Sequence, residues 1–213
     1  AAVMLGDYLI SNAFHLCSRI GDPAINLALG RVTNTLCAGE LLQLHHRDDP
    51  GLDESTYLEI IRRKTASLIA ESCRLGAVLS GADESVARAL HEAGVELGVA
   101  FQVQDDILDL TGKTGVIGKS AGRDLAKGKL TLPLIIHLAE ADAAARSRTL
   151  DLLDRGEHRA LAAVLAEHGA IDAATTRARA HVARAMDAID RVPRGPATEL
   201  LAMLAGRIVD RER

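Results

Sequence analysis

Three carboxylates interrupt an apolar stretch at residues 101–109, which read FQVQDDILD. At 3.6 residues per helical turn, Asp105 and Asp109 would lie on one face, with Asp106 beside them and Gln102 one turn earlier. Carboxylates at this spacing repel each other on an isolated helix, and a hard divalent cation such as Mg²⁺ offsets that repulsion. The stretch therefore predicts a metal site at Asp105, Asp106 and Asp109, with a solvated acidic patch as the alternative.

The residues that flank these acids favour the metal site over the solvated patch. A solvated face would be polar around the acids, whereas the flanking positions carry side chains that belong in a core. These apolar neighbours are Val99, Ala100, Phe101, Val103, Ile107, Leu108 and Leu110. The acids are therefore predicted to line a cavity in a helical bundle.

A loop rich in glycine and lysine follows the acids directly, over residues 111–129. Glycine lets the backbone approach a ligand closely, and lysines are mobile point charges that attract phosphates. The lysines of this loop are Lys113, Lys119, Lys127 and Lys129. Their order differs from the Gly-x-x-x-x-Gly-Lys-Ser/Thr phosphate-binding loop and no strand precedes them, so an ordinary nucleotide-binding fold is not expected. The alternative is a surface loop without a ligand.

A basic cluster, Arg62-Arg63-Lys64, precedes Thr65 on a predicted helix. Taken alone, it reads as a solvated face. Next to a carboxylate face for Mg²⁺ and a lysine-rich loop, Lys64 and Thr65 instead complete a predicted diphosphate site. In such a site metal ions bridge phosphate oxygens and lysines neutralise the leaving group, while an apolar cavity shields the rest of the substrate.

The rest of the chain reads as helices separated by short breaks. Helical spacing of apolar residues covers 1–20, 23–46, 55–80 and 83–110, and more helices follow residue 131. Pro23 suits the first turn of the second helix, and Asp83 is a predicted N-cap for the helix that carries the acids. No segment alternates with a period of two. The prediction is an all-α fold of eight or nine helices, in a single domain over residues 1–213.

Composition narrows the class of function. Hydrophobic residues make up 48% of the 213 residues and charged residues 25%, as in an ordinary globular protein. The net charge of −4 disfavours nucleic-acid binding, and no apolar run is long enough for a membrane span. Cys17, Cys37 and Cys73 lack metal-ligand spacing and are predicted to be buried free thiols, which favours a reducing compartment and a cytoplasmic location.

An ordered series of motifs resembles the all-trans polyprenyl diphosphate synthases, a family that extends allylic diphosphates with isopentenyl diphosphate. The matching motifs are Gly6-Asp7, Gly39-Glu40-x-x-Gln43, Lys64-Thr65-Ala66, Phe101-Gln102-x-x-Asp105-Asp106-x-x-Asp109, Gly118-Lys119-x-x-Gly122-x-Asp124 and Gly128-Lys129-x-Thr131-x-Pro133. Asp-Asp-x-x-Asp alone is unspecific, whereas the whole series over residues 6–133 is specific. The chain resembles the C-terminal two-thirds of such a synthase, which implies an isoprenoid-synthase-type helical bundle around a deep central cavity.

The resemblance implies a role for the matching charged residues. Asp105 would bind Mg²⁺ directly, with Asp106 and Asp109 in support. Lys64 and Lys119 would bind the allylic diphosphate and assist its departure.

The remaining matches are implied to act on the organic part of the substrates. Thr65 and Gln102 would place oxygens near the developing carbocation, and Phe101 would lie against isopentenyl diphosphate. Lys129 would contact the substrate or order its loop. The implied reaction is ionisation of the allylic C–O bond, attack by the isopentenyl double bond and loss of a proton.

One feature of the family has no counterpart in the chain. The resemblance implies a first aspartate-rich motif and basic residues for isopentenyl diphosphate shortly before the helix that begins here. Asp48 and Asp49 lie next to Pro-Gly and are predicted to be turn residues instead. The expectation is a chain truncated at its N-terminus that is inactive by itself.

Two other functions are compatible with the sequence. One is a non-catalytic partner subunit of a heteromeric prenyl synthase. The other is a class I terpene cyclase, although such cyclases carry an Asn/Ser/Glu-type triad where this chain has an Asp-rich motif followed by Gly-Lys.

Residues 40–46 and 57–65 resemble long-chain synthases. The resemblance also implies a homodimer with the early helices at its interface and transient membrane contact for product release.

Overall fold

The computed structural model describes residues 1–112 and 124–210, which contain helices and turns but no strand. The elements in chain order are α1 (Ala2–Ser18), α2 (Pro23–His45), α3 (Glu54–Ile61), the π-helical turn η1 (Arg62–Ala66), α4 (Ser67–Leu79), α5 (Glu84–Thr111), the 3₁₀ turn η2 (Leu125–Lys127), α6 (Leu132–Glu140), α7 (Ala143–Asp154), α8 (His158–Glu167), α9 (Ala170–Ile189) and α10 (Pro196–Arg207). The all-α class is confirmed. These residues form ten α-helices rather than eight or nine, partly because the segment predicted over 55–80 is divided by η1.

Helix starts follow local sequence signals. Pro23 occupies the first turn of α2, as predicted, and Asp22 caps that helix by accepting a hydrogen bond from the Ala24 N–H at 2.9 Å. Asp83 directly precedes α5, as predicted, but its side chain makes no capping hydrogen bond. Asp49 acts in a turn, as expected, since its carboxylate accepts a hydrogen bond from the Gly51 N–H at 2.9 Å.

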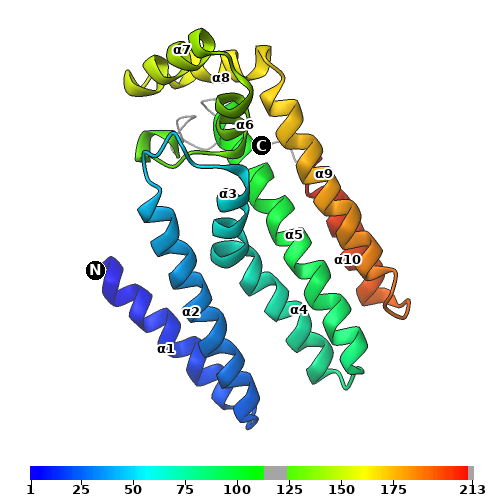
Figure 1. Cartoon of the computed structure of the whole chain (residues 1–213). Coiled ribbons are helices and arrows are strands. Elements are labelled where there is room, and N and C mark those ends of the chain that lie inside the picture. Colours follow the sequence, from blue (N-terminus) through cyan, green and yellow to red (C-terminus); the bar gives the residue numbers. More distant parts are fainter. Residues whose placement is uncertain (113–123, 211–213) are drawn as a thin grey trace.

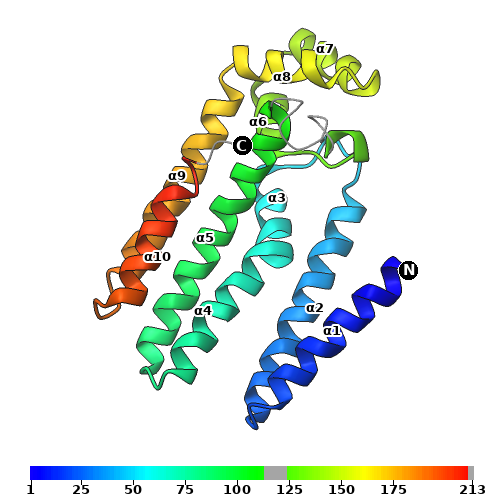
Figure 2. The same cartoon turned by 180° about the vertical axis from the view of Figure 1, so that it is seen from behind.

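Helix α5 runs through the middle of the bundle, with α4 on one side and α9 on the other (Figure 1). Its C-terminal half contributes to the main core, together with α3, α6, α8 and α9. Its N-terminal half packs against α9 and α10 in a second, smaller core. Both views place α6, α7 and α8 around the C-terminal end of α5, where the acids lie (Figure 2).

Helix α1 lies at the edge of the bundle against α2, and none of its residues is buried (Figure 1). The expectation of buried thiols is wrong: Cys37 of α2 is exposed, and Cys17 and Cys73 are half-buried, although all three are free. Helical spacing identifies an apolar face, but only the neighbouring elements decide whether that face is covered. Within the described ranges, none of the helices combines the length and hydropathy that a membrane-spanning segment requires.

Candidate functional site

Helix α5 does not present its three acids alike. Asp106 is fully buried, whereas Asp105 and Asp109 are half-buried. Asp109 accepts a hydrogen bond from the backbone N–H of Asp124 at 3.0 Å. Among residues 1–112 and 124–210, no three His, Cys, Asp or Glu side chains meet in a group that could hold a metal ion. Asp106 differs from the other two acids because one residue step along the helix turns it by about 100° onto the buried face.

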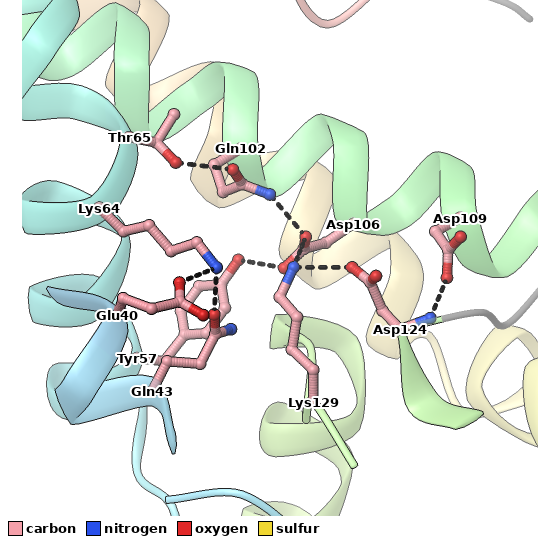
Figure 3. Close-up of polar contacts among 10 residues, drawn as sticks. All are labelled: Glu40, Gln43, Tyr57, Lys64, Thr65, Gln102, Asp106, Asp109, Asp124 and Lys129. Atoms are coloured by element: carbon pink, nitrogen blue, oxygen red, sulfur yellow. Dashed lines mark hydrogen bonds and ion pairs between the residues drawn. The ribbon is translucent and has the colours of Figure 1, made fainter. Parts of the chain in front are cut away.

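Asp106 is instead the centre of a hydrogen-bonded network (Figure 3). Its Oδ1 accepts hydrogen bonds from Gln102 Nε2 at 2.8 Å and from Lys129 Nζ at 2.7 Å. Its Oδ2 accepts one from the Tyr57 hydroxyl at 2.8 Å. Lys129 also donates to Asp124 Oδ2 at 2.7 Å. These partners satisfy a carboxylate that would be strongly destabilising if it were buried alone.

Burial and pairing together set the protonation of this network. Burial raises the pKa of the Asp106 carboxyl, while the Lys129 ammonium and the hydrogen bonds from Gln102 and Tyr57 oppose that rise. Burial also disfavours the charged form of Lys129, but Asp106 and Asp124 outweigh it and raise the pKa of the ammonium above its usual range. Burial, reinforced by the negative charge of Asp106, raises the pKa of the Tyr57 hydroxyl. Tyr57 and Lys129 therefore remain proton donors to Asp106.

Lys64 and Thr65 lie on η1, the π-helical turn between α3 and α4. Such turns within α-helices are frequent at functional sites. Two glycines let the neighbouring helices α2 and α5 approach η1 closely. A Cβ at Gly39 of α2 would lie 2.7 Å from the backbone nitrogen of Lys64, and a Cβ at Gly98 of α5 would lie 2.5 Å from a Cα of the turn. Backbone packing on both sides thus fixes the positions of Lys64 and Thr65.

Three predicted site residues, Lys64, Thr65 and Gln102, lie on this turn or next to it (Figure 3). The Thr65 hydroxyl donates to Gln102 Oε1 at 2.8 Å, which joins η1 to the Asp106 network. The Lys64 ammonium contacts Gln43 Oε1 and Glu40 Oε2 of α2, both at 2.5 Å. The glutamate and glutamine that the sequence places one turn apart on α2 therefore hold Lys64 in position.

A pocket of about 310 Å³ opens beside these residues. Its lining residues are Glu40, Gln43, Leu44, Arg47, Lys64, Asp124, Lys127, Gly128 and Lys129. The cations Arg47, Lys64, Lys127 and Lys129 thus come from the turn after α2, from η1 and from the segment after residue 124. Basic side chains converging on one opening suit an anionic ligand.

Other predicted residues have different outcomes. Lys119 lies outside the described residues, as does Lys113. Phe101 is 37% exposed on α5. Tyr57 was not singled out from the sequence, although it lies seven residues, or two helical turns, before Lys64 and is 2% exposed. An isolated tyrosine in an apolar helical face, two turns before a predicted site lysine, is the signal that could have identified it.

The sequence is similar to known proteins of one family. Residues 1–167 match the family model described as polyprenyl synthetase. The chain belongs to the polyprenyl synthetase family. This polyprenyl synthetase chain is 34% identical to the octaprenyl diphosphate synthase of Haemophilus influenzae, over 99% of this chain and 65% of that protein. It is 33% identical to heptaprenyl diphosphate synthase component 2 of Bacillus subtilis, over 99% of this chain and 61% of that protein.

Solved structures agree with this assignment. A polyprenyl synthase from Caulobacter crescentus, crystallised in complex with calcium and isoprenyl diphosphate, superposes with a TM-score of 0.89 at 34% identity, over 98% of this chain and 65% of that chain. The isoprenoid-synthase-type fold expected for a polyprenyl synthetase is thus confirmed. The chain spans less than two thirds of the length of each of these three relatives.

Proposed function

We propose that the protein condenses isopentenyl diphosphate with an allylic diphosphate to form a trans-polyprenyl diphosphate. The observation that carries this proposal is the pocket in which Lys64 and three further cations meet, next to the network of Thr65, Gln102 and Asp106. The cations suit the diphosphate groups, and the neighbouring hydroxyl and amide oxygens suit a developing carbocation. Membership of the polyprenyl synthetase family supports the same reaction.

Asp105 and Asp109 are the residues proposed to hold Mg²⁺. Magnesium often takes only one or two protein carboxylates and completes its shell with waters and substrate phosphates, so a pair of half-buried carboxylates one helical turn apart fits this ion. When bound, Mg²⁺ would neutralise the charge that develops on the departing diphosphate. Asp106 would support the site from behind, since both of its oxygens already accept hydrogen bonds. Lys129 would order its own segment by joining Asp106 to Asp124.

The other residues would act on the substrates themselves. Lys64 and Lys119 would bind the allylic diphosphate, whose C–O bond breaks so that the electron pair leaves with diphosphate. Thr65 and Gln102 would stabilise the allylic cation, and Phe101 would lie against the isopentenyl chain. Attack by the isopentenyl double bond forms the new C–C bond, and a proton is then lost to the released diphosphate.

Prenyl transfer can be tested with labelled isopentenyl diphosphate and an allylic diphosphate. The assay uses the protein together with any sequence that precedes Ala1, because residues 1–213 alone are expected to be inactive. We expect polyprenyl products of heptaprenyl length or longer, formed with Mg²⁺ and abolished by EDTA. Asp105→Asn should lower kcat/KM by about 100-fold or more, because it weakens stabilisation of the leaving group. The matched control is Asp151→Asn, at an exposed position on α7, which should retain activity. Absence of product from both substrates would contradict the proposal, and cyclised products from the allylic diphosphate alone would indicate a terpene cyclase.

A second candidate is a subunit of a two-component synthase. The Bacillus subtilis relative is named component 2 of its enzyme, which favours this possibility. A homogeneous preparation of the protein distinguishes the two candidates. Prenyl transfer by that preparation supports the first, whereas activity that requires addition of a different chain supports the second.

A further inference from the structure

A relay of four side chains leads from the core to the half-buried Thr65 of η1 (Figure 3). The Tyr57 hydroxyl donates to Asp106 Oδ2, and Gln102 Nε2 donates to Asp106 Oδ1, both at 2.8 Å. The Thr65 hydroxyl in turn donates to Gln102 Oε1 at 2.8 Å. The relay therefore crosses from α3 to α5 and then to η1.

The chemistry of Asp106 imposes a direction on this relay. The carboxylate that pairs with the Lys129 ammonium at 2.7 Å accepts hydrogen bonds, and Gln102 turns its NH₂ group toward it. The amide oxygen of Gln102 then faces Thr65, whose hydroxyl proton is used in the bond to that oxygen. The lone pairs of the Thr65 hydroxyl are left to face other partners. The opposite amide orientation would present N–H donors, which repel a cation.

We infer that Tyr57 is a positioning residue for prenyl transfer. By holding Asp106, it keeps Gln102 and Thr65 oriented as acceptors toward the allylic cation. Tyr57 itself does not contact the substrate, because it is fully packed in the core. This inference rests on the proposed function. It adds Tyr57 to the residues that act in the reaction, and it explains what orients the oxygens of Gln102 and Thr65.

The two anchors of the Asp106 carboxylate differ in rigidity. The Lys129 ammonium reaches Oδ1 at the end of a long side chain that is 20% exposed. The same ammonium also pairs with Asp124. Tyr57 reaches Oδ2 from a ring that core packing holds in place. Loss of the Tyr57 hydroxyl would leave Oδ2 without this donor and free the carboxylate to rotate, so that Gln102 would lose its fixed orientation.

Tyr57→Phe tests the inference because it removes the hydroxyl and keeps the ring. We expect kcat for prenyl transfer to fall by about 10- to 100-fold, while KM for either diphosphate changes by less than about threefold, since the lost effect concerns the transition state. The control is Ser147→Ala, which removes a hydroxyl at an exposed position on α7 and should stay within about twofold of the wild type.

A double-mutant cycle separates positioning from a merely structural role. In a Gln102→Met background, Tyr57→Phe should lower kcat by less than about twofold, because the residue that links Asp106 to Thr65 is already gone. An equal loss in both backgrounds would overturn the inference. Calorimetric binding of the allylic diphosphate shows whether Tyr57→Phe folds; loss of both binding and helical content would mean that Tyr57 is only structural and would also overturn it. A wild-type protein without prenyl transfer would instead refute the proposed function.

Discussion

Glu96 is a half-buried carboxylate of α5 that two side chains of α9 hold in place. Its Oε2 lies 2.7 Å from His181 Nδ1 and accepts a hydrogen bond from Arg184 Nε at 2.8 Å. Burial disfavours the charged form of Glu96, but these hydrogen bonds and the charge of Arg184 outweigh it and lower the pKa of the carboxyl below its usual 4.5. A group whose pKa is lowered by folding stabilises the folded state above its unfolded pKa.

Glu96→Gln is therefore expected to reduce the free energy of unfolding at neutral pH by about 1–3 kcal/mol. The difference from the wild type should shrink as the pH falls below 4.5 and passes through the lowered pKa of the folded state. Urea unfolding over a pH series measures both effects. Glu92→Gln, one turn earlier, is the control: Glu92 pairs with Arg191 at 55% exposure and should contribute less than about 1 kcal/mol. Equal losses in the two variants would contradict this prediction.

At the scale of elements, the contact of α5 with α4 and η1 depends on residues without a side chain. Gly94 and Gly98 of α5 face the backbone so closely that a Cβ at either position would lie 2.5 Å from a Cα of α4 or η1. Such an approach fixes the distance between the helix that carries the acids and the turn that carries Lys64. The site geometry is thus a consequence of helix packing as much as of the polar residues.

Gly98→Ala should destabilise the protein by about 1–3 kcal/mol, because the added methyl group can be accommodated only by moving backbone. It should also reduce activity by shifting η1 relative to α5. Gly76→Ala, in α4, is the matched control. A Cβ at Gly76 would meet no atom within 4 Å, so this change should stabilise the protein by up to about 1 kcal/mol through helix propensity. Thermal unfolding measures both, and a change of the same sign in both variants would argue against the packing explanation.

At the scale of the whole molecule, the apolar surface of α1 is the most conspicuous open feature. Its exposed large apolar residues are Val3 at 76%, Met4 at 70%, Leu5 at 58%, Tyr8 at 65%, Leu9 at 59%, Ile10 at 41% and Leu16 at 60%. A run of large apolar side chains on one helix is typical of a surface that another protein covers. The family resemblance implies that a second copy of the chain covers it.

We therefore expect the wild-type protein to be a dimer by light scattering. Leu9→Glu should shift it to the monomer, because a charge would be buried without a partner at the interface. Leu200→Glu, on α10 at 52% exposure, is the control and should leave the dimer intact. A monomeric wild-type protein, or a dimer that survives Leu9→Glu, would contradict this expectation.

The sequence by itself determined the helical class and several helix starts, and its motifs named the residues proposed for the site. Helix periodicity and caps depend on neighbouring residues, so Pro23 and the long helix of the acids could be predicted. The meeting of Lys64, Thr65 and Gln102 was expected from the resemblance, and the structure brings Thr65 and Gln102 into direct contact.

Only the tertiary structure decided which acid faces inward and what holds it. The sequence places Asp105 and Asp106 side by side, but the helices packed around α5 bury Asp106 and leave Asp105 half-exposed. Tyr57 and Lys129 lie 49 and 23 residues from Asp106 in the sequence, and no local pattern predicts that both bind it. A buried charge takes its partners from whichever elements surround it, so these contacts were settled by packing and not by spacing along the chain.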